Sequence, residues 1–267
     1  MTAFDNVRRI FRSESFRRIA GGFDRRLLIH KANEVGPRMR LLHCRRLEEL
    51  GRLPSFDDGL TDDAISGIDR FGASTVEIFM VSHRWLRPSL DARLSHPDDS
   101  NKTKAKALIE FTKWRRNWVR RRHGFELEIF YWVDYCCFDQ RDVANYLPML
   151  PLWVACCERM VRYETPDYHN RAWCRLELLL SHAFAFADHH VAIGGGFVAS
   201  GTNNGSEEKT PLQRPSEGVM TDDADAAGIT LLEQFAEEFE PATVDRITRR
   251  RLAKAKFGQT TISCYRL

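Results

Sequence analysis

The feature that most constrains the fold is a pair of continuous apolar runs, each of which stops abruptly at polar residues. The first run, Thr75-Val-Glu-Ile-Phe-Met-Val81, is rich in β-branched residues and stops at Ser82-His83-Arg84. The second run, Glu128-Ile-Phe-Tyr-Trp-Val133, stops at Asp134. Continuous apolar runs of this length are typical of strands buried on both faces, as in parallel sheets covered by helices. The sequence therefore predicts a parallel sheet with polar residues directly after its strands.

Segments predicted to be helical alternate with these strands. Two further short strands are expected at residues 159–163 and 190–193, and helices are expected after Asn101, at residues 147–157 and at residues 170–187. An alternation of strands and helices favours a parallel sheet wrapped by helices through right-handed crossovers. We therefore expect an α/β fold with four to five parallel strands, and a site at the carboxyl ends of these strands.

Periodicity and composition divide the chain into four parts. Residues 1–72 are expected to form a helical extension, because apolar residues recur there at a spacing of three to four between arginines. Residues 73–196 form the α/β core. Residues 197–218, rich in Gly, Asn and Ser, are predicted to be a mobile loop, since they lack the glycine spacings of phosphate-binding loops. Residues 219–267 are predicted to be a helical segment packed on the core.

Several classes of protein are disfavoured by composition. No apolar run approaches the roughly 18–20 residues that cross a bilayer, and the N-terminus lacks the apolar segment of a secretory signal, so we expect a cytoplasmic protein without a membrane anchor. The 7 cysteines are an odd number and include two adjacent pairs, which favours reduced, buried thiols over disulfides or a metal site. The net charge of +3 disfavours nucleic acid as a partner, although residues 113–122 are basic.

Three polar groups fall where the sheet is expected to place a site. They are residues 82–85, residues 134–140, and the Trp173-Cys-Arg-Leu-Glu177 segment of a helix. Trp173 and Glu177 are four positions apart and therefore share a helix face. A carboxylate beside an indole is partly desolvated, which strengthens its attraction to positive charge. The candidate site residues are Ser82, His83, Arg84, Trp85, Asp134, Asp139, Trp173, Arg175 and Glu177.

Each candidate also has a purely structural interpretation. Trp173 is compatible with a core position, and Glu177 with a surface ion pair to Arg171 or Arg175. Helix capping or loop hydrogen bonds would explain the other polar candidates, which are His83, Asp134, Asp139 and Gln140.

Taken together, the three motifs resemble those of the TIR (Toll/interleukin-1 receptor) domain family. Members have a first strand ending in Ser-His-Arg or a similar sequence, a second strand ending in Asp, and a helix carrying Trp-x-x-x-Glu. In this chain Ser82-His83-Arg84, Asp134 and Trp173-Cys-Arg-Leu-Glu177 occur in that order within residues 74–194. The segment Trp132-Val-Asp-Tyr-Cys-Cys-Phe-Asp-Gln140 also resembles an element of fungal heterokaryon-incompatibility domains. The resemblance implies a flavodoxin-like, TIR-like fold.

Many TIR domains cleave NAD at the bond between nicotinamide and ribose, so the resemblance implies N-glycosidase activity on NAD, NADP or a related nucleotide. Glu177 would be the catalytic carboxylate, acting on an oxocarbenium-like ribosyl group by its charge or as a nucleophile. Trp85 and Trp173 would stack on the bases, and Arg84 and Arg175 would hold the pyrophosphate. NAD would be the substrate and no cofactor is expected. The alternative is a non-enzymatic signalling module that self-associates through a TIR-like surface.

Overall fold

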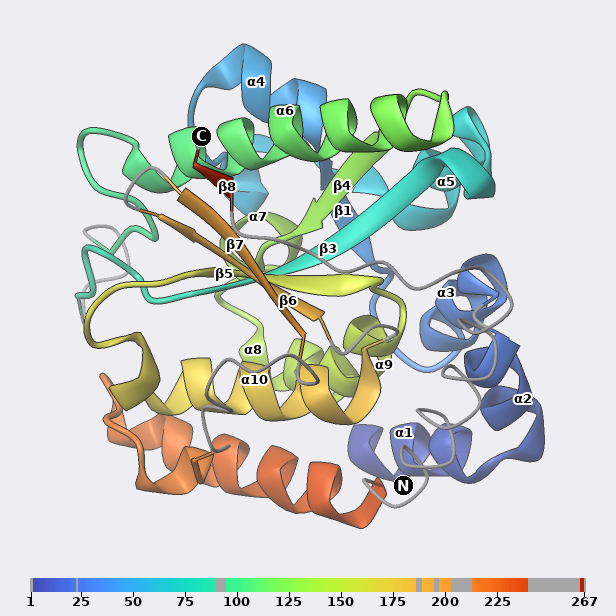
Figure 1. Cartoon of the computed structure of the whole chain (residues 1–267). Coiled ribbons are helices and arrows are strands. Elements are labelled where there is room, and N and C mark those ends of the chain that lie inside the picture. The colour runs from blue at the N-terminus through green and yellow to red at the C-terminus, as the bar shows by residue number, and fades with distance from the viewer. Residues whose placement is uncertain are drawn as a thin grey trace.

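A single sheet lies between two layers of helices (Figure 1). This computed structural model describes residues 2–22, 24–89, 95–185, 189–194, 197–202, 213–239 and 265–266. Helix α6 (Thr103–His123) covers one face of the sheet, and α9 (Leu150–Ala155) and α10 (Ala172–Phe184) cover the other. No helix in these ranges is long and apolar enough to cross a membrane.

The strands of the sheet lie in the order β2-β1-β4-β3-β5-β6-β7-β8. Four neighbouring strands in the middle, β4, β3, β5 and β6, are parallel, and the strands outside them pair antiparallel. The strands are β1 (Arg40–His43), β2 (Asp62–Asp63), β3 (Val76–His83), β4 (Glu128–Trp132), β5 (Arg159–Tyr163), β6 (His189–Gly194), β7 (Phe197–Thr202) and β8 (Tyr265–Arg266).

The prediction of an α/β fold is confirmed, and so is its parallel centre of four strands. Strand β3 is continuous and apolar because it lies at the centre of the sheet, between β4 and β5, with Ile78 and Phe79 fully buried. The sheet as a whole is mixed, because antiparallel strands extend the parallel centre on both sides.

The connections that follow β3 and β5 lie on opposite faces of the sheet. After β3 the chain passes through α6 on one face of the sheet, and after β5 it passes through α10 on the other face (Figure 1). Strands β3 and β5 are neighbours, and the connections that follow them lie on opposite faces of the sheet. A crevice therefore forms at the carboxyl ends of these two strands. Open α/β sheets bind ligands in such a crevice. The fold thus places the end of β3 and the start of α10 beside each other.

The prediction that residues 1–72 form only a helical extension is wrong. Strand β1 pairs with β4 and with β2, so this region extends the sheet. The four residues of β1 are too few to show a period of two, and α4 (Cys44–Leu50) begins directly after them. The helices of this region are α1 (Ala3–Arg12), α2 (Glu14–Gly22), α3 (Arg25–Asn33), α4 and α5 (Ala64–Phe71).

The prediction of a loop at residues 197–218 is also wrong in part. Residues 197–202 form β7, which pairs antiparallel with β6. Residues 203–212 lie outside the described ranges. Of the predicted C-terminal helical segment, residues 226–239 are helical and Tyr265–Arg266 forms β8, while residues 240–264 lie outside the described ranges.

The N-terminal helices and the C-terminal helix pack together over α10. Phe11 of α1 lies 4.9 Å from Phe184 of α10 and 5.3 Å from both Phe235 and Phe239, measured between ring centroids. This aromatic cluster joins α1 and the helix of residues 226–239 to the same face of the core. The remaining short helices are α7 (Asp134–Cys137), α8 (Val143–Tyr146), η1 (Phe56–Asp58), η2 (Ala73–Thr75), η3 (Leu147–Met149), η4 (Tyr168–Asn170), η5 (Pro215–Glu217) and η6 (Asp223–Asp225).

Candidate functional site

A cavity of about 250 Å³ opens at the carboxyl ends of β3 and β4, against the start of α10. One part of its wall is ionisable and includes His83, Asp134 and Glu177. The rest is largely aromatic and aliphatic. The apolar wall contains Trp85, Trp132, Phe138, Tyr146, Leu147, Leu150 and Trp173. A cavity with an apolar wall and a few convergent polar groups has the general character of a ligand site.

Glu177 is held at the inner wall of this cavity by a hydroxyl group. It lies on α10, which packs against β3, and its side chain is 7% exposed. Ser82, at the carboxyl end of β3, donates from Oγ to Glu177 Oε2 at 2.6 Å. The interpretation of Glu177 as a surface carboxylate paired with an arginine is therefore wrong. Within the described ranges Glu177 takes part in no salt bridge.

The environment of Glu177 disfavours its negative charge. Burial raises the pKa of Glu177 from 4.5 to about 8, and the nearby charge of Asp134 acts in the same direction. The hydrogen bond from Ser82 and the charge of Lys104 offset only part of this effect. At neutral pH the isolated chain therefore carries Glu177 largely in its neutral form.

Asp134 is charged because polar groups surround it. His83 Nε2 lies 2.9 Å from Asp134 Oδ1, and Trp85 Nε1 donates to Oδ2 at 3.0 Å. Burial raises the pKa of Asp134, but the attraction of His83 and the hydrogen bonds outweigh burial and hold the pKa below 3.8. Burial and the charge of Lys104 lower the pKa of His83. Because a carboxylate can only accept a hydrogen bond, His83 Nε2 carries the proton that Asp134 accepts.

The outer wall of the cavity comes from a distant part of the chain. Trp173 Nε1 donates to Asp225 Oδ2 at 2.6 Å, and Arg171 donates to the hydroxyl of Thr221. Val219 anchors this segment, because its N–H donates to the Asn170 carbonyl at 2.7 Å beside the start of α10. Residues 219–225 thus fix the positions of Trp173 and Arg171 at the cavity.

The loop after β3 is tied down by a buried lysine. Lys104 is fully buried, and its Nζ donates to the carbonyl of Arg84 at 2.9 Å and to that of Pro97. Burial lowers the pKa of Lys104 from 10.5 to about 8. Arg84 itself lines the cavity and pairs with Asp167 at 2.6 Å. Lys104 therefore holds the backbone that carries Arg84 and Trp85.

Seven of the nine candidate residues lie at or directly behind the cavity wall. His83, Arg84, Trp85, Asp134, Trp173 and Glu177 line the cavity, and Ser82 lies behind the wall in contact with Glu177. Asp139 and Arg175 do not line it. Asp139 pairs with Arg141 at 2.8 Å near the surface, and Arg175 donates to the carbonyls of His169 and Arg214.

Several residues of the site were missed in the sequence. The buried position of Lys104 could have been predicted from its spacing. Lys104 lies four positions before Leu108 and seven before Phe111, on the buried stripe of α6. A lysine on an apolar stripe is unusual and marks a buried charge. Tyr168 and Asp225 carry no such signal, because their partners are brought to them only by the tertiary fold.

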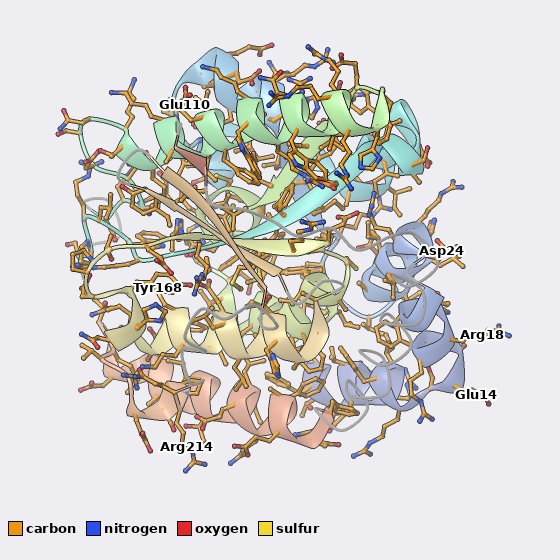
Figure 2. The ribbon with its side chains drawn as sticks, in the orientation of Figure 1. Glu14, Arg18, Asp24, Glu110, Tyr168 and Arg214 are labelled. Carbon is orange, nitrogen blue, oxygen red and sulfur yellow. The ribbon has the colours of Figure 1, made fainter. Side chains whose placement is uncertain are left out.

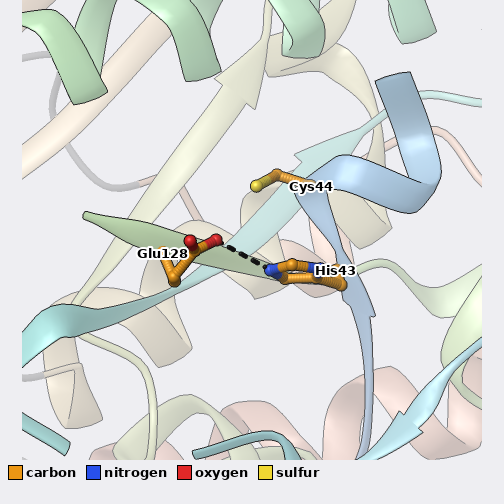
Figure 3. Close-up of side chains that lie close together, drawn as sticks. All are labelled: His43, Cys44 and Glu128. Atoms are coloured by element: carbon orange, nitrogen blue, oxygen red, sulfur yellow. Dashed lines mark hydrogen bonds and ion pairs between the residues drawn. The ribbon is translucent and has the colours of Figure 1, made fainter. Parts of the chain in front are cut away.

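A second group of ionisable side chains lies at the opposite end of the sheet (Figure 3). His43, Cys44 and Glu128 are buried, and their potential ligand atoms lie within 4.8 Å of one another. Glu128 already bonds to His43 at 3.0 Å and to Arg45, and burial raises the pKa of the Cys44 thiol to about 11. The carboxylate is therefore compensated by protein groups and the thiol is protonated, so this cluster is a poor metal ligand set.

The comparisons with known proteins gave no match to this chain. It matches no protein-family signature, no curated protein and no solved structure. The assignment of a function therefore depends on the geometry of the cavity.

Proposed function

We propose that this chain cleaves the N-glycosidic bond of NAD, NADP or a related nucleotide, with Glu177 as the catalytic carboxyl group. The observation that carries the proposal is the position of Glu177, which is buried, lines the cavity and takes part in no salt bridge within the described ranges. A buried carboxylate without a paired cation is costly, so Glu177 keeps its proton in the free chain, and a carboxyl group of this kind at a cavity wall favours a ligand that supplies positive charge.

The nicotinamide ring of oxidised NAD supplies such a charge. A cationic ring or an oxocarbenium-like ribosyl group beside Glu177 would lower the pKa of this residue from about 8 and release its proton. The resulting carboxylate would stabilise the transition state by its charge, and no separate general acid is needed because nicotinamide leaves as a neutral base. Binding and ionisation of Glu177 would therefore occur together.

The rest of the cavity suits the other parts of a nucleotide. Trp85 and Trp173 offer aromatic rings to a base, and both are positioned by hydrogen bonds from their indole nitrogens to Asp134 and Asp225. Arg84 and Arg171 are the cationic groups of the wall and would contact phosphate. The volume of about 250 Å³ lies below the roughly 300–1,000 Å³ of sites that enclose a drug-sized ligand. We therefore expect the cavity to enclose the nucleoside half of the substrate.

The topology supports the finer assignment of a flavodoxin-like, TIR-like fold. Counted along the chain, the four parallel strands lie in the order second, first, third, fourth. Flavodoxin-like sheets begin with the same order. Glu177 lies on the helix after the third of these strands, where its side chain reaches the end of the first strand.

The direct test is release of free base by the purified chain from NAD, NADP and nucleoside monophosphates, separated by chromatography. We expect base release from at least one of them, and a loss of at least about 100-fold in Glu177→Gln, the size of effect seen when one stabilising group is removed. Glu110→Gln is the matched control, since Glu110 is exposed on α6 away from the sheet (Figure 2). No release by the wild type, or equal rates in wild type and Glu177→Gln, would refute the proposal and leave the non-enzymatic module.

A further inference from the structure

Two hydroxyl groups in series stand behind Glu177. The Tyr168 hydroxyl contacts Ser82 Oγ, and Ser82 Oγ contacts Glu177 Oε2. Tyr168 and Ser82 are fully buried, and Tyr168 lies in η4 beside the start of α10 (Figure 2). Neither residue was assigned a role in the chemistry proposed above.

The direction of these hydrogen bonds follows from the number of hydrogens. Ser82 has one hydroxyl hydrogen, which it donates to Glu177 when the carboxyl group is charged, so in that state the phenol of Tyr168 is the donor in its contact with Ser82. Both hydroxyls then point their hydrogens toward the carboxyl group. A donor that is itself polarised by a second donor binds an anion more strongly, because hydrogen bonds in a chain reinforce one another.

We propose that Tyr168 is a positioning residue for Glu177, which acts through Ser82 to fix the orientation of the carboxyl group and to favour its charged form. The hydroxyl chain engages Oε2 of the carboxyl group. The proposal deepens the function proposed above and rests on it for its catalytic meaning. Its effect on the charge of Glu177 can be measured without any substrate.

Other groups that face Glu177 also affect whether its carboxyl group is charged or neutral. They come from each element packed around it, and they are Asp134 after β4, Lys104 on α6, the backbone of His83 on β3 and Cys174 on α10. Asp134 disfavours the charged form of Glu177, whereas Lys104 and the His83 backbone favour it. The test must therefore change the phenol while leaving these groups in place.

The chain contains a matched control for this change. Tyr131 is also a fully buried tyrosine, and its hydroxyl lies 2.7 Å from Thr112 Oγ1. There the chain of hydroxyls ends on the carbonyl of Leu108, to which Thr112 donates at 2.9 Å. Tyr168→Phe and Tyr131→Phe thus remove the same atom from similar surroundings, but only the first change alters a chain that ends on Glu177.

The experiment is a carbon-13 titration of the glutamate side-chain carboxyl groups, in which the Glu177 signal is identified by its loss in Glu177→Gln. We expect Tyr168→Phe to raise the proton affinity of Glu177 about three- to tenfold, the worth of one hydrogen bond. The half-maximal point of the pH profile for base release should move to higher pH by the logarithm of that factor, about 0.5–1 pH unit. Tyr131→Phe should leave both quantities unchanged.

Equal proton affinities of Glu177 in wild type and Tyr168→Phe, or an equal change in Tyr131→Phe, would overturn the proposal. Should Tyr168→Phe fail to fold, Ser82→Ala carries the test, since it removes the direct donor and should raise the affinity at least as much. The titration tests the hydroxyl chain and the assay tests the proposed function, so one can give a negative result without the other. A wild type without activity, but with the expected titration, would refute the proposed function and keep the hydroxyl chain.

Discussion

The two ends of the parallel sheet differ in the groups that pair with their carboxylates. Three glutamates lie at the amino end. Glu77 is in β3, Glu128 is in β4, and Glu158 directly precedes β5. Each of the three is paired with an arginine. At the carboxyl end, Glu177 contacts a serine and Asp134 contacts a histidine, and neither is paired with an arginine in the part of the chain that the structure describes.

The amino end uses its charges to attach helices. Arg115 of α6 bonds to Glu77 through both Nε, at 2.8 Å, and Nη2. Arg25 of α3 pairs with Glu158, which also accepts the N–H of Ile78 at 2.6 Å. The pKa of Glu77 lies below 4.5, because the bond to Arg115 outweighs the effect of burial. These carboxylates are compensated within the protein and have no need of a ligand.

The comparison teaches where a ligand is expected. Compensated charges anchor structure, whereas a buried carboxyl group whose own surroundings disfavour its charge is available to an incoming cation. Glu177, with a pKa of about 8, is such a group and lines the cavity. If the comparison is correct, substitutions at the amino end should alter stability, and substitutions at Glu177 should alter activity and the dependence of stability on pH.

The largest effect is expected from Arg115→Met at the amino end. Arg115 is buried, and its removal leaves Glu77 of β3, whose side chain is 16% exposed, without the partner that bonds to both of its oxygens. Breaking a buried ion pair on one side costs about 3–5 kcal/mol, because the remaining charge is uncompensated. We expect the free energy of unfolding, measured by urea denaturation, to fall by that amount.

Arg120→Met is the control for this prediction. Arg120 lies on the same helix, and its pair with Glu126 is exposed, so its loss should leave the free energy of unfolding nearly unchanged. Similar losses in the two variants would show that the buried pairs of the amino end do not anchor α6, and the contrast between the two ends would disappear.

A smaller effect is expected for the pH dependence of stability. In the unfolded chain Glu177 loses its proton near pH 4.5, whereas in the folded chain it keeps the proton until about pH 8. Between these values Glu177 binds fewer protons in the unfolded state than in the folded state, so the contribution of Glu177 to wild-type stability should fall as the pH rises. Glu177→Gln lacks this proton. Its stability relative to wild type should therefore increase by about 2 kcal/mol from pH 5 to pH 7, since one proton contributes about 1.4 kcal/mol per pH unit.

The measurement is urea denaturation of wild type and Glu177→Gln at a series of pH values. Glu110→Gln, which changes an exposed glutamate on α6, should follow the wild type at every pH. A constant difference between Glu177→Gln and wild type across this range would mean that Glu177 ionises normally in the folded chain. Glu177 would then resemble the carboxylates at the amino end.

The parallel centre of the sheet can be predicted from the sequence, because a strand that is buried on both faces has a continuous run of apolar residues. Strands β3 and β4 lie in continuous apolar runs. The polar residues at the ends of these runs, such as Ser82 and Asp134, lie at the same edge of the sheet because the strands are parallel. Strand β1 has no such run. It has four residues between segments of helical periodicity, and only its pairing with β2 and β4 makes it a strand.

The candidate site could be predicted where it depends on helix spacing. Trp173 and Glu177 share a face of α10 and line the cavity together. Arg175 is two positions from each of them, and at about 100° per residue it points to the other side of the helix, so the same spacing argues against it. Tyr168 could not be found in this way, since its contact with Ser82 joins residues 86 positions apart.

The smallest effect is expected from zinc at the amino end, where His43, Cys44 and Glu128 could offer three ligands. Zinc would have to displace His43 and Arg45 from Glu128 and to remove a proton from a thiol whose pKa is about 11. The wild-type melting temperature should therefore stay the same when zinc is added, because only a ligand that binds the folded state raises it. A rise that grows with zinc concentration and is lost in Cys44→Ala would contradict this expectation. It would show that Glu128 is less fully compensated than its contacts indicate, and that the amino end also holds a ligand site.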